Sequence, residues 1–221
     1  MTPLPEDPSR IAFGNSATRH RLKWAVNKAL KLGLEVREAE TEDDLRAWYP
    51  LYLEVMRQNA VPPRSYRFFR AIWELFRRER ILRLLLAERH ESGRRTLLAG
   101  SIILTFGATA CYAFTGGKKK DFVFHPNDLI QWQAIHDACR MGAQRYDFGE
   151  VAEEHQRLVN FKSKWGAEPI PQFRYYCPGP PASAVSDRTP PGRIRQATRA
   201  VWRRLPLQAT ARCGDWIYSY L

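Results

Sequence analysis

The sequence predicts an α/β domain in which a mixed, mostly antiparallel sheet is flanked by helices and followed by a helical C-terminal tail. Apolar residues at helical spacing before residue 80 give way to three apolar segments joined by short turn sequences, which favour hairpins. A further helical pattern, a short strand and a short helix come next. This order is typical of one sheet covered by helices.

Three helices are expected in the first part of the chain. The first runs from Ser16 to Leu32, the second follows the capping-box sequence at Thr41, and the third follows Ser65. Pro50 should kink or break the second helix, because proline has no amide hydrogen for the helical ladder. Residues 1–15 look disordered.

The remaining elements alternate between strands and helices. Helices are expected from Pro126 to Met141, ended by Gly142, and over residues 159–165, ended by Gly166. Apolar and aromatic runs predict strands over residues 34–37, 81–88, 96–106, 110–115, 145–148 and 172–176.

The charge balance bears on the class of partner. The chain has 221 residues and a formal net charge of +12, because 35 lysines and arginines outnumber 23 acidic residues. This balance favours a polyanionic partner, such as tRNA, a lipid pyrophosphate, an anionic membrane or coenzyme A. A basic soluble protein without such a partner is the alternative.

The cysteines and the apolar runs bear on cellular location. Cys111, Cys139, Cys177 and Cys213 share no metal-binding spacing and have no histidine cluster near them in sequence. They are expected to be reduced, mostly buried thiols of a cytoplasmic protein, with no metal site and no disulfide. No secretory leader is recognised, and the longest apolar run, residues 97–106, is too short to cross a bilayer.

Two short motifs carry the candidate chemistry. In Tyr146-Asp147-Phe148-Gly149, Asp147 ends a predicted strand, where ligands of α/β folds usually bind. In Phe161-Lys162-Ser163-Lys164-Trp165-Gly166, Lys162 lies next to an aromatic residue on a short predicted helix. The alternatives are an aspartate that only caps a loop and a lysine on a solvated helix face.

The order of these motifs resembles a known family. Pro126-Asn127-Asp128-Leu129-Ile130-Gln131-Trp132-Gln133-Ala134-Ile135, then Gly142, Y-D-F-G and F-K-x-x-W-G-A, are similar to the second half of the FemAB-like peptidyltransferases. These enzymes of the GNAT fold move an aminoacyl group from aminoacyl-tRNA to an amine of a cell-wall precursor. The resemblance implies a GNAT-like fold, an acyl- or aminoacyltransferase acting on a cell-envelope amine, and no bound cofactor.

The resemblance also implies roles for residues. Lys162 would contact the transferred group or the tRNA end, with Phe161 and Trp165 as stacking surfaces. Asp147 would orient or deprotonate the amine. Because no Ser-His-Asp or Cys-His arrangement stands out, direct attack of the amine fits better than an acyl-enzyme. Lys164 is expected to point elsewhere and to serve as an internal control.

One departure concerns the donor. CoA-dependent GNAT enzymes carry Gln/Arg-x-x-Gly-x-Gly/Ala after the central strand, whereas this chain has Gly116-Gly117 followed by Lys118, Lys119 and Lys120. These lysines either meet phosphates or form a solvated charge run. Tyr112 and His125 flank the expected cleft. The alternatives are an acyl-CoA-dependent acetyltransferase with a degenerate phosphate loop, and a non-catalytic basic module that binds tRNA or an anionic surface.

A second departure concerns length, because the resemblance covers one of the two GNAT-like halves of Fem enzymes. The chain is expected to be a fragment, half of a split enzyme or a stand-alone relative. A homodimer or a partner chain would then close the cleft, with Trp24 and Trp48 as exposed interface anchors.

The expected organisation has three parts. Residues 1–40 form a basic N-terminal helix and linker, residues 41–177 the transferase domain, and residues 178–221 a Pro-rich linker with a basic amphipathic tail. The arginines of the tail, together with Trp202 and Trp216, predict contact with the anionic inner face of a membrane. Packing against the domain itself is the alternative.

Overall fold

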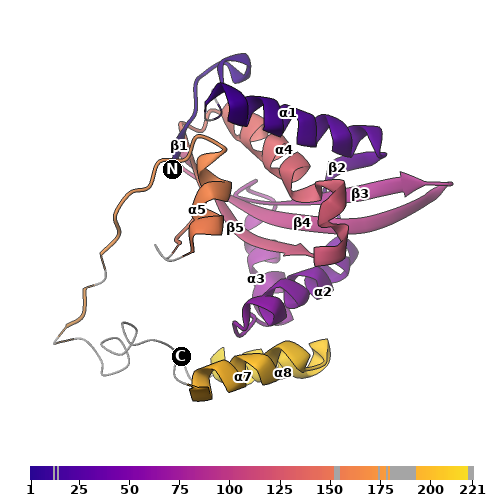
Figure 1. Cartoon of the computed structure of the whole chain (residues 1–221), viewed down its shortest axis with the longest axis vertical. Coiled ribbons are helices and arrows are strands. Elements are labelled where there is room, and N and C mark those ends of the chain that lie inside the picture. The colour runs from indigo at the N-terminus through magenta and orange to yellow at the C-terminus, as the bar shows by residue number, and fades with distance from the viewer. Residues whose placement is uncertain are drawn as a thin grey trace.

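The structure is a computed structural model that describes residues 1–11, 13, 15–151, 155–173, 175–177, 179 and 193–218, without the side chains of residues 193–197. In this part of the chain, six strands form one sheet in the order β1-β6-β5-β4-β3-β2 (Figure 1). The strands are β1 Thr2–Pro3, β2 Leu34–Glu38, β3 Leu82–Glu91, β4 Arg94–Phe106, β5 Thr109–Gly117 and β6 Arg145–Asp147. Neighbours are antiparallel except β5 and β6, which are parallel, so the predicted mixed sheet is confirmed.

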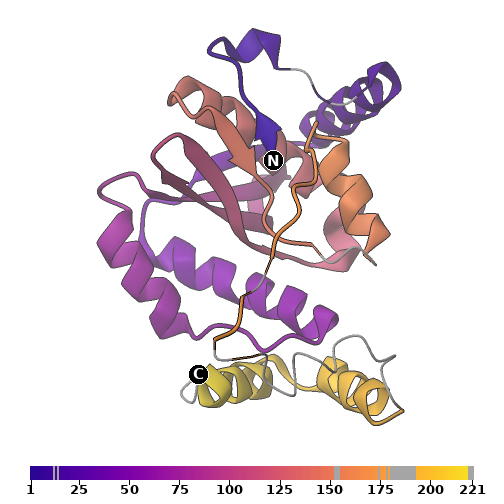
Figure 2. The same ribbon diagram turned by 90° about the vertical axis from the view of Figure 1, so that its left-hand side faces the viewer.

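Helices cover both faces of this sheet (Figures 1 and 2). One face carries α1 Ser16–Lys31, α4 Pro126–Arg140 and α5 Gln156–Ser163, and the other carries α2 Glu42–Asn59 and α3 Tyr66–Phe76. On the first face, Ile103 and Ala110 of the sheet pack with Ile135 of α4, and on the second, Leu84 and Ile102 pack with Trp48 and Phe69. Burial of this apolar area is the main force that holds the layers together.

Local sequence signals set several helix ends. Thr41 accepts a hydrogen bond from the Asp44 amide, and the Asp44 carboxylate accepts one from the Thr41 amide, so the predicted capping box is confirmed. Ser65 caps α3 through the Phe68 amide. Pro50 does not break the helix, because α2 continues through it, and the alternative of a kink stays a prediction.

The described residues of the N-terminal segment are ordered, which corrects the expectation of disorder over residues 1–15. Thr2–Pro3 pairs with β6, and a short 3-10 helix, η1, spans Pro8–Arg10. Phe13 is buried and packs against Trp132 and Trp165. Together with α1 on α4 and β2 in the sheet, this segment makes residues 1–40 part of the same core, not a separate linker.

The predicted aromatic strand over residues 172–176 is not a strand in the part of this segment that the structure describes. Phe173 and Tyr175 are unpaired and exposed. The edge of β6 that such a strand would need is taken by β1, and Glu168 pairs with Met1 through both backbone groups. The free energy that a strand gains from pairing is therefore not available to residues 172–176.

The tail forms two helices, α7 Arg193–Arg204 and α8 Leu207–Tyr218, which lie along α2. Leu207 and Ala211 pack against the core on that side, and Arg57 donates to the Leu205 carbonyl at 3.3 Å. Trp216 remains 67% exposed. Among the described helices, none is long and apolar enough to cross a membrane.

The parallel pairing of β5 and β6 is short, and this positions the candidate site. It runs from Thr109 opposite Arg145 to Cys111 opposite Asp147, after which β6 ends. β5 continues to Gly117, paired only with β4, and a bulge places Ala113 out of register. The sheet is therefore open beyond Cys111 and Asp147.

Candidate functional site

Asp147 lies at the point where β6 ends. Its Oδ1 accepts a hydrogen bond from the Gly149 amide at 2.8 Å, and Gly149 has a φ of +71°, which favours glycine. This local turn fixes the carboxylate at the opening between β5 and β6. The sequence placed Asp147 at a strand end, and the structure agrees.

Lys162 reaches the same turn from α5. Its Nζ donates to the Gly149 carbonyl at 2.7 Å and to the Glu150 carbonyl at 3.1 Å. An ammonium group has three N–H donors, so one remains for a further acceptor. Burial lowers the pKa of Lys162, and the nearby charge of Asp147 opposes that shift. Asp147 and Lys162, which the sequence proposed together, are therefore brought together.

Cys111 is the third group at this opening. It lies opposite Asp147 in the parallel register, and burial raises the pKa of its thiol. A thiol with a raised pKa is a poor nucleophile. Of the four cysteines only Cys139 is buried, and Cys177 is exposed, so the expectation of mostly buried thiols is wrong.

Tyr112 points away from Cys111, into the core under α4. Its hydroxyl lies among the polar side chains of Ser101, Thr115 and Gln131, and burial raises its pKa. Tyr146, also buried, donates to Gln131 Oε1 at 2.9 Å. Tyr112 thus belongs to a buried polar cluster, and its substrate-binding role stays a prediction.

The two aromatic side chains of the F-K-x-x-W-G motif differ in accessibility. Trp165 is fully buried and meets Phe13 edge-on at 5.4 Å, so the expectation that it offers a stacking surface is wrong. Phe161 is half-buried, with Lys164 Nζ 4.6 Å from its ring centroid. Phe161 keeps its predicted place beside Lys162.

A second polar cluster joins α4 to α5. Asp128 Oδ1 pairs with Lys164 Nζ at 2.5 Å, and Asp128 Oδ2 lies 3.3 Å from His125 Nδ1. Trp24 of α1 meets the His125 ring edge-on at 5.3 Å. Lys164 does point away from Lys162, but its ion pair makes it unsuitable as an inert control.

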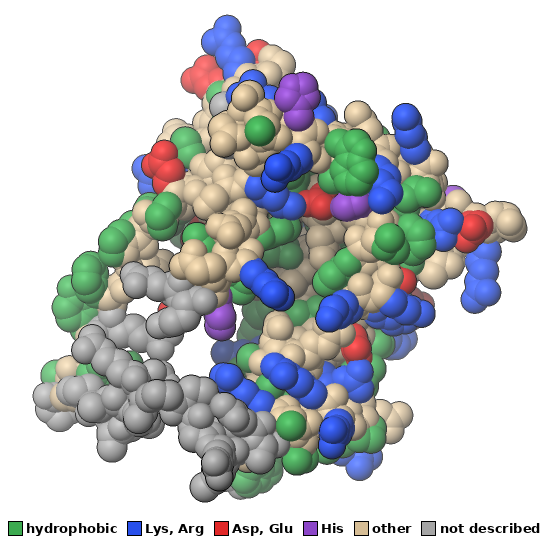
Figure 3. Space-filling view, in the orientation of Figure 1, with side chains coloured by type: hydrophobic (Ala, Val, Ile, Leu, Met, Phe, Trp, Pro, Cys, Tyr) green, Lys and Arg blue, Asp and Glu red, His purple; other side chains and the backbone are tan. Residues whose placement is uncertain are grey.

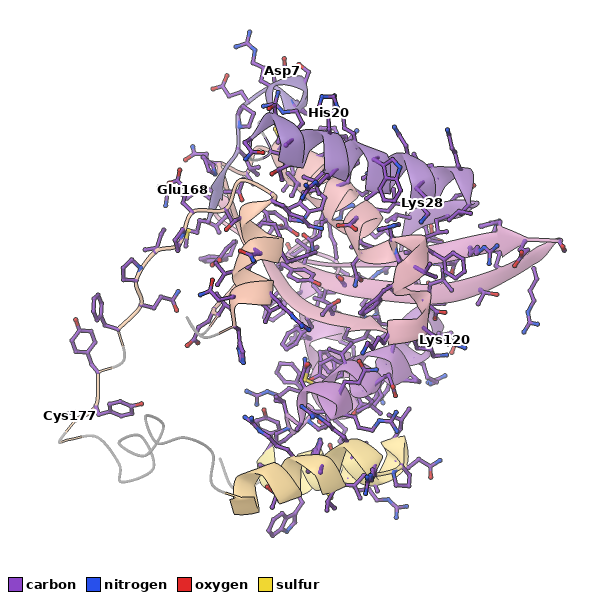
Figure 4. All side chains as sticks on the ribbon, in the orientation of Figure 1. Asp7, His20, Lys28, Lys120, Glu168 and Cys177 are labelled. Carbon is purple, nitrogen blue, oxygen red and sulfur yellow. The ribbon has the colours of Figure 1, made fainter. Side chains whose placement is uncertain are left out.

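Of the lysines after β5, Lys119 and Lys120 lie on η2, a 3-10 helix over Lys119–Phe124, and Lys118 is its N-cap. Lys118, Lys119 and Lys120 are exposed, and Figure 4 labels Lys120 on this segment. Figure 3 shows that this face is hollowed between the upper and lower helices, with lysine and arginine side chains gathered below the hollow. Their phosphate-binding role stays a prediction.

No group of three or more metal-ligating side chains occurs in the part of the chain that the structure describes. His155, at the start of α5, is exposed. Trp24 is exposed as expected, whereas Trp48 is buried and donates to the Gly100 carbonyl at 2.9 Å, so it cannot anchor an interface.

The sheet thus opens between the parallel strands β5 and β6, with Cys111, Asp147 and Lys162 at the opening. Residues 16–157 match the family described as acetyltransferase (GNAT) domain, and the chain belongs to this family. The fold is similar to that in the crystal structure of FemX, with a TM-score of 0.64 and 17% identity over 75% of this chain. These findings confirm the predicted GNAT fold, and the likeness to FemX is one of fold.

The chain spans little more than half of the FemX chain, since the match covers 57% of it. The search of curated proteins gave no significant match.

Proposed function

We propose that this GNAT-type acyltransferase transfers an aminoacyl or acyl group to an amine of a cell-envelope precursor. The observation that carries the proposal is the half-buried Lys162 ammonium, held by two backbone carbonyls beside Asp147 where the sheet opens. The similarity of the fold to FemX supports aminoacyl transfer, and the family description supports acyl transfer.

The reaction is the aminolysis of an activated ester or thioester. The acceptor nitrogen attacks the acyl carbon, the bond from that carbon to the donor oxygen or sulfur breaks, and one amine proton is lost. The third N–H of Lys162 would stabilise the oxygen that gains charge. Asp147 accepts from Gly149 through one oxygen, and its carboxylate would orient the amine or take its proton.

The donor is proposed to be aminoacyl-tRNA, with acyl-CoA as the alternative. The net charge of +12 suits either polyanion. The acceptor is proposed to be lipid-linked, met at the cytoplasmic face of a membrane with help from the tail. A homodimer or a partner chain that closes the open side of the site remains part of this proposal.

The test compares transfer by wild-type protein and two lysine variants, with acetyl-CoA or aminoacyl-tRNA as donor and a lipid-linked muropeptide as acceptor. Lys162→Met should slow transfer about a hundredfold, because loss of one preorganised donor costs on the order of 3 kcal/mol in the barrier. Lys31→Met is the matched control, since Lys31 is exposed at the end of α1. Equal rates for both variants, or binding of tRNA without any transfer, would contradict the proposal.

A further inference from the structure

A cavity lies on one face of the sheet and the candidate chemistry on the other. The cavity, of about 570 Å³, lies between α1, α4 and α5, and its lining residues include Arg21, Asp128 and Lys164. The buried Tyr146 packs in the core on this face. Successive side chains of a strand point to opposite faces, so Asp147 points to the face that α2 and the tail cover. Cys111, opposite Asp147, agrees with this, because its other neighbour, Leu104, packs in the core on the α2 side.

A row of cations borders the α2 face. Lys118, just after β5, is exposed and lies within electrostatic range of Glu54 of α2. One turn further along α2, the Gln58 carbonyl accepts a hydrogen bond from Arg203 Nε of α7 at 3.0 Å. Arg199 precedes Arg203 by one helical turn and is exposed on the same side of α7. Lys118, Arg199 and Arg203 thus form a basic rim along the C-terminal end of α2.

The charge of this basic rim is not neutralised within the part of the chain that the structure describes. None of its three cations forms an ion pair with a described carboxylate, and Glu54 is engaged by Arg57 at 2.7 Å. Arg203 uses one N–H group on Gln58, and its other N–H groups remain for a further acceptor. Figure 3 shows lysine and arginine side chains gathered below the hollow. Guanidinium groups suit phosphate oxygens, so the basic rim suits a chain of phosphates.

The structure favours a polynucleotide over a lipid surface as the partner of the basic rim. A helix that lies on a membrane buries an apolar face among the lipids. In this tail, Leu207 and Ala211 already pack against the core on the α2 side. Trp216 is rotated by about 180° from Leu207 at 100° per residue, so it belongs to a different surface. The basic rim exposes charge, which is the feature that binds a phosphate backbone.

We propose that the basic rim binds the phosphate backbone of the acceptor stem of the tRNA donor. The inference rests on the proposed function, in which aminoacyl-tRNA is the donor. From Cys111 to Lys118 the chain advances seven residues in extended form, a distance of about 20 Å. The unpaired CCA end of a tRNA is long enough to cross this distance. The stem therefore stays on the basic rim while its terminal ester reaches Lys162 and Asp147 on the same face of the sheet.

The test measures binding of a CCA-ended tRNA minihelix to the full chain at several salt concentrations. The double variant Lys118→Gln/Arg199→Gln removes two rim charges and leaves the bond between Arg203 and Gln58 in place. It should bind about tenfold more weakly, and the slope of log affinity against log salt should fall by about 1.5. Lys118→Arg/Arg199→Lys keeps both charges and should keep the slope of the wild type.

Arg94→Gln/Arg95→Gln is the matched control, because it also removes two exposed positive charges. Both arginines lie at the hairpin between β3 and β4, which projects away from α5 in Figure 1. Its affinity for the minihelix should stay within twofold of wild type. Equal binding by the two glutamine double variants would overturn the proposal. So would weaker binding of the rim variant to phosphatidylglycerol vesicles with unchanged binding of the minihelix, which would assign the basic rim to a lipid surface.

Kinetics separate a failure of this inference from a failure of the proposed function. With aminoacyl-tRNA as donor, the rim variant should raise KM more than it lowers kcat, whereas Lys162→Met should lower kcat. Transfer from acetyl-CoA by a protein that does not bind the minihelix would refute the basic rim and leave acyl transfer standing. Conversely, rim-dependent binding of the minihelix without any transfer would support the basic rim and refute the proposed chemistry.

Discussion

At the scale of single residues, Lys162 shows how the fold changes a common side chain. Two backbone carbonyls bind its ammonium group, while partial burial removes part of its water shell and lowers its pKa. The charged form is the one that can stabilise a developing oxyanion. The proposed role of Lys162 should therefore depend on pH.

This coupling predicts the alkaline side of the pH–rate profile. Because the folded pKa is lowered, transfer by the wild type should decline with rising pH before the ordinary lysine pKa of about 10.4 is reached. The Lys162→Arg protein should transfer the group at a reduced rate. Its rate should not decline in this pH range, because the arginine side chain keeps its charge. The measurement is kcat/KM against pH for both proteins. Identical alkaline limbs would mean that another group titrates.

The sequence predicted Lys162 and Asp147 because both lie in compact local motifs. It did not predict Arg21, Asp128 or Lys164, because these residues meet only when α1, α4 and α5 pack together. The sequence of α1 did contain a weak indication of this cavity between α1, α4 and α5. The α1 residues that line it include positions 18, 21, 22 and 25, which have the spacing of one helix face. That stripe contains polar residues, so an apolar pattern search passes over it.

At the scale of elements, the N-terminus of α2 joins the edge of the sheet through a charged network. Arg37 of β2 pairs with Asp44 at 2.6 Å and with Glu88 of β3 at 2.9 Å. The hydrogen bond from Arg37 lowers the pKa of Asp44 to about 2. The network ties a helix cap to two strands.

This network predicts how the free energy of unfolding changes at acidic pH. A carboxylate with a lowered folded pKa stabilises the fold above its unfolded pKa, and that contribution is lost as pH falls toward 2. Wild-type protein should lose on the order of 1 kcal/mol through Asp44 between pH 4 and pH 2, because Arg37 is 38% exposed and solvent screens part of the ion pair. Asp44→Asn should be less stable at pH 7 and lack this part of the loss. Urea unfolding at several pH values measures it.

Asp43→Asn is the control for this measurement. Asp43 is exposed, and among the described residues it pairs only with Arg46 of the same helix, so its loss should change stability by less than about 0.5 kcal/mol. If both variants showed the same pH dependence as the wild type, the Arg37 network would have no energetic role.

Most elements were predictable because their signals are local. The capping box at Thr41 and the hairpins around β4 need only neighbouring residues. The two-residue strand β1 was not predictable, since it exists only through its pairing with Tyr146 and Arg145 far along the chain. The same pairing explains why the described residues of the aromatic run near residue 175 form no strand.

At the scale of the whole molecule, the tail is docked against α2 and not held away from the domain. Gly214 lies so close to Pro63 that an added Cβ would be 2.3 Å from the Pro63 carbonyl oxygen. Arg64 also lies over the Tyr218 ring at 3.9 Å. The close approach of Gly214 to Pro63 therefore determines whether α8 can dock against the domain.

Gly214→Ala should weaken tail docking, because an overpacked contact with backbone typically costs about 1–3 kcal/mol. The central sheet should stay folded, since the tail lies outside α2. Limited trypsin digestion is the measurement: cleavage at Arg212 should become about tenfold faster, as the open population grows. Gln208→Ala, an exposed position of the same helix, should digest like wild type. Equal digestion of all three proteins would show that the tail does not depend on this contact.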